Sequence, residues 1–163
     1  MSDTKKSLSS ALFPETKGKN LEGKSYLLPQ DFEGELNLVI IAFQREQQNT
    51  VDTWLPTADL MEKLHTKLRY YELPVIARVN PLARWFIRAG MRSGIKDPKS
   101  RQKTITLYLD KTAFRKALGI DTEENIHVLL VDKKGKTAWR TEGACSVRTG
   151  ESLSDFIKSY LGA

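Results

Sequence analysis

The sequence predicts an α/β fold in which a central β-sheet is covered by helices on both faces. A nearly continuous apolar run at 36–43 is typical of a strand that is buried on both sides. From Val51 to Tyr71, apolar residues recur every three or four positions, which predicts one long amphipathic helix. Two further segments, at 126–131 and 136–142, flank a turn at 132–135 that contains Gly135, and they predict a hairpin.

The N-terminal part of the chain predicts little regular structure. Residues 1–20 lack hydrophobic periodicity, so we expect a flexible arm followed by a single domain over 21–163. The only apolar run near the start, 11–13, is too short for the core of a signal peptide. Turn residues surround short apolar pieces at 21–34, which predicts a loop with a short strand.

The remaining elements are expected in an order that continues the alternation of strands and helices. Pro74 limits the long helix, and Asn80 followed by Pro81 is a helix start signal. The predicted elements are a strand at 74–79, a helix at 82–93, a basic loop at 95–103, a strand at 104–109, a short helix from Asp110 to before Gly119, and a closing helix at 151–161.

This order of elements resembles the thioredoxin superfamily. Residues 125–140 resemble the strand–turn–strand unit of peroxiredoxin-like proteins, and 107–120 resemble the strand–helix insertion of that branch. Within it, the chain is similar to the family of the mitochondrial ATP synthase assembly factor. That similarity rests on Trp54-Leu55, the basic stretch, and Leu118-Gly119-Ile120 leading to the hairpin with Trp139. The resemblance implies a three-layer sandwich with a central mixed sheet, helices on both faces and the peroxiredoxin-like insertion.

Redox members of the superfamily carry two cysteines in the turn after the strand at 36–43, and this chain has none there. A hydroxyl cannot replace a thiolate in disulfide exchange, so we expect Thr50 to cap the long helix instead. The cis-proline of redox members corresponds to His127, and a cis bond before a non-proline residue costs about 2.5–4 kcal/mol, so we expect a trans bond. A vestigial, polar active-site region is therefore expected, able to bind an anion or simply exposed as polar surface: Gln47, Gln48, Asn49, Thr50 and His127.

The single cysteine, Cys145, excludes an intramolecular disulfide and fits a reducing compartment. It is expected to be a small, half-buried residue at the end of a strand. The alternative is a single-cysteine thiol peroxidase or thiol-transfer protein that uses Cys145 as its thiol. One cysteine and two histidines give no spacing typical of a zinc site, and no metal or cofactor is expected.

The basic charge of the chain is concentrated in one segment. Residues 78–103 hold eight basic residues and one acidic residue, a local charge of +7 in a chain of net charge +6. Such a local excess predicts an anionic partner. The candidate residues for binding an anion or partner are Arg84, Arg88, Arg92, Lys96, Lys99, Arg101 and Lys103.

Within the helix predicted at 82–93, Arg84, Arg88 and Arg92 recur every four residues and share one face. Two interpretations of this helix are open. The interleaved residues Leu82, Trp85, Phe86 and Ala89 fit a face directed at the core, with the arginines as a solvated face. The same mixture of Trp, Phe and Arg also suits a helix at an anionic membrane surface.

Together these patterns predict a non-catalytic binding or assembly protein, chaperone-like in its action, with the single-cysteine thiol enzyme that uses Cys145 as the alternative. If the family resemblance holds, the protein serves a membrane complex through the basic helix and loop at 78–103. The expected partner is a protein, an anionic membrane surface, or both. Nucleic acid is not expected, because no aromatic-rich single-strand motif is present. No transmembrane segment is expected, and the predicted location is the cytoplasm, including the periphery of a membrane.

Overall fold

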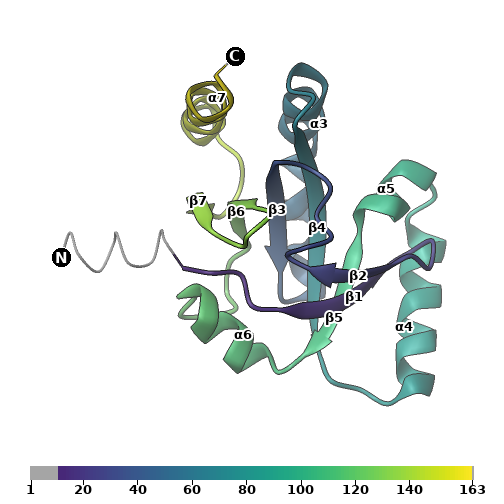
Figure 1. Ribbon diagram of the computed structural model, residues 1–163. Helices are drawn as coiled ribbons and strands as arrows, with labels where there is room; N and C mark the ends of the chain where they lie inside the picture. Colours follow the sequence, from purple (N-terminus) through teal and green to yellow (C-terminus); the bar gives the residue numbers. More distant parts are fainter. Residues whose placement is uncertain (1–10, 163) are drawn as a thin grey trace.

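The structure is a computed structural model that describes residues 11–162. Its centre is a seven-stranded sheet with the strand order β2-β1-β5-β4-β3-β6-β7 (Figure 1). β3, β4 and β5 run parallel to one another, and the other pairs are antiparallel, so the sheet is mixed as predicted. The strands are β1 (Thr16–Asn20), β2 (Ser25–Leu28), β3 (Leu36–Ala42), β4 (Leu68–Ala77), β5 (Ile105–Leu109), β6 (His127–Asp132) and β7 (Thr137–Glu142).

Helices cover both faces of this sheet. The helical elements are η1 (Arg45–Gln47), α2 (Gln48–Asp52), α3 (Leu55–Leu64), α4 (Pro81–Gly94), α5 (Pro98–Lys103), α6 (Lys111–Leu118) and α7 (Val147–Leu161). Side chains of α2, α3 and α7 form one buried cluster with one face of the sheet, and those of α6 form a second cluster with the opposite face. The predicted α/β three-layer sandwich is confirmed.

Strand β3 occupies the middle of the core. Leu38 and Ile40 join the cluster under α3, whereas Val39 and Ile41 join the cluster under α6. Both faces are therefore covered, which explains the continuous apolar run. The one polar residue, Asn37, is buried, and its amide donates to the carbonyls of Gly34 and Val131.

The prediction of one long helix from Val51 to Tyr71 is wrong. The chain forms two helices, α2 and α3, and then turns into β4, which begins at Leu68. Leu68 and Tyr70 belong to one core cluster and Tyr71 and Leu73 to the other. Because β4 is buried on both faces, its apolar residues do not alternate with polar ones. They continue the spacing of the apolar residues in α3, so the sequence does not indicate where the helix ends and the strand begins.

Pro74 lies inside β4 and does not mark its start. It forms the last pair of the β3–β4 ladder with Ala42, and the paired residues of the β4–β5 ladder begin at Val75. The missing N–H of the proline therefore falls where one ladder ends and the next begins, a position that tolerates proline.

Several helix boundaries follow their predicted signals, and others differ. Asn80 caps α4 by accepting a hydrogen bond from the backbone N–H of Ala83, as expected. Part of the predicted basic loop forms α5, capped by Asp97. The closing helix begins at Val147, because Ser146 caps it through the backbone N–H of Thr149. The flexible arm predicted for 1–20 lies partly outside the described residues, and its last part forms β1.

Candidate functional site

The turn after β3 is filled by the side chain of Gln47. Its oxygen accepts hydrogen bonds from the backbone N–H groups of Phe43 at 2.8 Å and Gln44 at 3.2 Å, and its nitrogen donates to the carbonyl of Glu123 at 2.6 Å. Gln47 is buried. An amide suits this place because it donates and accepts at once and satisfies groups that would otherwise be buried without partners.

The other members of the vestigial region are dispersed around this turn. Gln48 is exposed and donates to Asp52 at 2.9 Å, and Asn49 is exposed. Thr50 lies within α2, which begins at Gln48, so the prediction that Thr50 caps a helix is wrong. The first helical turn starts earlier because η1 precedes α2.

His127 begins β6 next to the same turn, and its ring lies 6.5 Å from the ring of Phe43. Within residues 11–162 the cis peptide bond is Leu28–Pro29, so the bond before His127 is trans, as expected. Burial lowers the pKa of His127, and the carboxylate of Glu142, 3.7 Å from its Nε2, partly opposes that shift. His127 therefore lies in the fold as a neutral ring near physiological pH.

Cys145 is separate from this region. Its backbone N–H donates to the hydroxyl of Thr53 at 3.0 Å, and its Sγ lies 3.6 Å from the hydroxyl of Thr57. The side chain is half-buried and packs against the core cluster under α3 and α7. The thiol contacts the hydroxyl of Thr57 and the backbone carbonyl of Ser146, which matches the expected half-buried residue after a strand.

Helix α4 has the opposite orientation to the predicted one. Leu82, Trp85 and Phe86 are 66%, 62% and 61% exposed, and no residue of α4 is buried. The interpretation that they face the core is therefore wrong. The arginine stripe is the side that lies toward the protein. The guanidinium of Arg84 lies over the ring of Tyr108 at 4.8 Å, and Arg92 pairs with Glu22 at 3.4 Å.

The polar face of β5 explains this orientation. Ile105 and Leu107 point into the cluster under α6, so alternation directs Thr106 and Tyr108 to the face on which α4 lies. A helix placed on a threonine and a tyrosine gains little by burying aliphatic groups there, whereas a guanidinium can stack on the tyrosine ring. Met91 of α4 contacts the hydroxyl of Thr106 at 3.9 Å.

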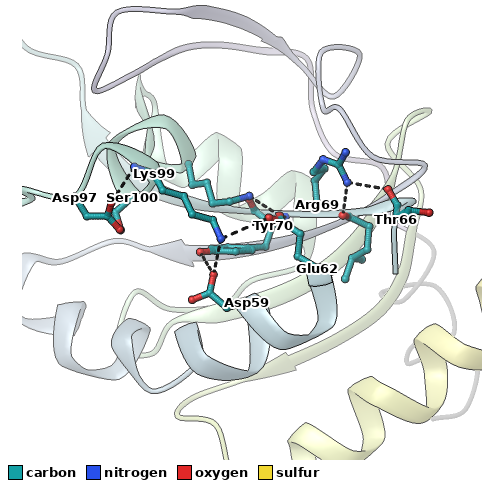
Figure 2. A network of polar contacts seen from close by, with 10 residues as sticks. Asp59, Glu62, Thr66, Arg69, Tyr70, Asp97, Lys99 and Ser100 are labelled. Carbon is teal, nitrogen blue, oxygen red and sulfur yellow. Dashed lines mark hydrogen bonds and ion pairs between the residues drawn. The ribbon is translucent and has the colours of Figure 1, made fainter. Parts of the chain in front are cut away.

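The cations of α5 are held within the molecule. Figure 2 shows Lys99 and Tyr70 converging on the carboxylate of Asp59, at 3.2 Å and 2.7 Å. Lys103 pairs with Glu62, and its ammonium lies 4.1 Å from the ring centroid of Tyr70. Burial lowers the pKa of Lys103, and the bond to Glu62 opposes this shift.

The seven predicted binding cations therefore divide into two groups. Arg92 and Arg101 both pair with Glu22, and Lys99 and Lys103 pair with carboxylates of α3. Within residues 11–162, no ion pair involves the remaining three, Arg84, Arg88 and Lys96. Helical spacing in the sequence identifies the arginine stripe of α4. The acidic partners of the paired cations cannot be identified in this way, because they lie between β1 and β2 and in α3, far away in sequence.

Comparisons with known proteins agree with this architecture. The family model described as ATP10 protein matches residues 4–159 of the chain. No curated protein matches the chain.

The similar solved structures are thioredoxin-like proteins. A Sco-family cytochrome c oxidase assembly protein, BsSco, has a TM-score of 0.61 at 13% identity, covering 91% of this chain and 93% of that chain. The thioredoxin domain of a thiol-disulfide oxidoreductase from Bacteroides vulgatus has a TM-score of 0.58 at 18% identity, covering 91% and 96%. A thiol:disulfide interchange protein from Bacteroides sp. has a TM-score of 0.55 at 19% identity, covering 94% and 90%. At these identities the likeness shows the thioredoxin-like fold.

No helix in 11–162 combines the length and the apolar character needed to cross a bilayer. The same part of the chain holds no group of three or more histidine, cysteine or acidic side chains arranged to bind a metal ion.

Proposed function

Because the chain belongs to the ATP10 protein family, we propose that it is a non-catalytic, chaperone-like assembly protein for a membrane complex. In this proposal the segment 78–103 provides the contact with an acidic partner protein or an anionic surface. The binding is electrostatic and includes no covalent step.

The filled turn after β3 is the observation that carries the proposal. Disulfide exchange requires a thiolate and a thiol leaving group, and Gln47 supplies an amide whose polar atoms are already used by the backbone. The only cysteine of the chain, Cys145, contacts the hydroxyl groups of Thr53 and Thr57. No second thiol exists to resolve a disulfide within the chain.

The cations of this segment that form no ion pair among the described residues give the proposed contact its residues. Arg84, Arg88 and Lys96 lie on or just after α4, and their charges are not neutralised by a carboxylate of the described chain. An acidic partner would supply that charge, and electrostatic complementarity of this kind favours fast and selective association.

The test is capture of ATP synthase subunits by the tagged protein from a native extract. Wild type is expected to recover them, and R84Q/R88Q/K96Q is expected to recover much less. A matched control is K116Q/K133Q/K134Q, which removes three exposed lysines elsewhere on the surface. Equal recovery with the two variants would contradict the assignment of 78–103 as the contact.

The alternative thiol enzyme has its own measurement. Peroxide consumption and thiol transfer are assayed for wild type and Cys145→Ser at equal concentration. The proposal requires that both proteins show the background rate. Turnover by wild type that disappears in C145S would establish the enzyme and refute the non-catalytic reading.

A further inference from the structure

The outward face of α4 is an apolar surface that nothing in the described chain covers. Leu82, Trp85, Phe86 and Ala89 are exposed and occupy positions i, i+3, i+4 and i+7, which share one face of a helix. The rings of Trp85 and Phe86 pack edge to face with centroids 5.2 Å apart, so they form one continuous projection. We call this set of four residues the α4 outer face.

We propose that the α4 outer face inserts into the boundary between headgroups and acyl chains of an anionic lipid bilayer. This inference deepens the proposed function, on which it rests, by assigning the aromatic residues as the part that meets the membrane. The exposed basic residues at the two ends of α4, Arg78 and Lys96, would then contact lipid phosphates.

The distribution of charge around the α4 outer face favours a lipid surface. Arg78 before α4 and Lys96 after it are exposed, and α4 contains no acidic residue. Trp, Phe and Leu on one side of a helix, together with nearby basic residues, are typical of helices that lie in a membrane interface. Anionic headgroups would also supply counter-charges for Arg78 and Lys96, which have no ion pair within residues 11–162.

The position of α4 in the fold allows such an insertion. In Figure 1, α4 lies at the margin of the molecule beyond β5, on the opposite side from β7 and α7. Because α4 contributes no buried residue, its outer face can enter a bilayer without opening either core cluster. During insertion, the contact of Arg84 with Tyr108 and the ion pair between Arg92 and Glu22 would keep α4 attached to the rest of the fold.

The experiment uses the full chain and sedimentation with two kinds of vesicle, phosphatidylcholine alone and phosphatidylcholine mixed with phosphatidylglycerol, at low and raised salt. Binding is expected to the anionic vesicles and to weaken with salt. W85A/F86A is expected to reduce that binding by about tenfold or more, because most of the inserted apolar area is removed. The matched control is L60A/L64A, which removes two exposed apolar side chains from α3.

Fluorescence separates insertion from adsorption. Trp54 is buried and Trp85 is largely exposed, so a blue shift on adding anionic vesicles is expected from Trp85 and should disappear in Trp85→Phe. Circular dichroism confirms that each variant is folded.

Three results would overturn the inference: no vesicle binding, equal binding to both kinds of vesicle, or unchanged binding by folded W85A/F86A. If ATP synthase subunits are still captured in any of these cases, the assembly function stands and only the membrane insertion is wrong.

Discussion

The side-chain oxygen of Gln47 accepts a hydrogen bond from the backbone N–H of Phe43 at 2.8 Å, in the turn that follows the central strand. This contact closes the turn in which redox proteins of the same fold carry their cysteines. The amide nitrogen of Gln47 extends the closure to the carbonyl of Glu123. Gln47 thus has a structural role in this turn, and we expect its removal to lower the stability of the fold.

Gln47→Ala is expected to lower the free energy of unfolding by about 2 to 4 kcal/mol, because it leaves buried backbone groups without partners. Asn49→Ala is the control, since Asn49 is exposed on α2, and it should change the value by less than about 0.5 kcal/mol. Urea denaturation measures both. Equal effects of the two substitutions would show that the amide network does not hold the turn.

His127 predicts a loss of stability on acidification. Burial lowers its pKa below the ordinary 6.5, so the unfolded chain binds the proton first as the pH falls. The contribution of neutral His127 to the stability of the fold is complete above pH 6.5, and it is lost as the pH falls from 6.5 through the folded-state pKa. NMR titration should place that pKa below 6.5, and Glu142→Gln should lower it further by removing the opposing carboxylate. A pKa above 6.5 would contradict the burial argument.

Glu72 predicts the opposite pH dependence. Burial raises its pKa above the ordinary 4.5, with the nearby Asp52 adding to the effect and a hydrogen bond from Gln48 opposing it. The folded chain then binds the proton more tightly, so stability is lost as the pH rises from 4.5 through the folded-state pKa. Glu72→Gln should therefore raise the free energy of unfolding at pH 7 more than at pH 4. If Glu72→Gln instead lowers the free energy of unfolding by the same amount at pH 7 and pH 4, the contacts of the carboxylate with Gln48 and Thr104 matter more than its charge.

Two tryptophans should differ sharply in their effect on stability. Trp54 is fully buried, and its indole N–H donates to the carbonyl of Gly143 at 2.9 Å. Trp54→Ala is expected to cost about 3–5 kcal/mol. Trp85→Ala removes an exposed ring and should change stability by no more than about 0.5 kcal/mol. A large loss with Trp85→Ala would restore the prediction that this face of α4 packs against the core.

Much of the fold could be predicted because local signals agree with the tertiary structure. The apolar run of β3, the turn at Gly135 with its positive φ, and the Asn80–Pro81 helix start are each specified by a few adjacent residues. The boundary at Leu68 could not be predicted, because a strand buried on both faces has no alternation to distinguish it from a helix.

The orientation of α4 could not be predicted for a different reason. Helical spacing tells which residues share a face, but the surface that receives the helix decides which face turns inward. Here Tyr108 of β5 contacts Arg84, Thr106 contacts Met91, and Trp85 and Phe86 are left exposed. Glu22, which neutralises Arg92, is likewise far away in sequence.

The central claim is that the protein acts without thiol chemistry, and Cys145→Ser tests it most directly because it removes the only sulfhydryl group of the chain. The measurement is the amount of assembled ATP synthase in cells that lack the protein and receive either wild type or C145S at equal abundance. The account predicts equal restoration by the two proteins. Failure of folded C145S to restore the complex, with wild type restoring it, would contradict the account.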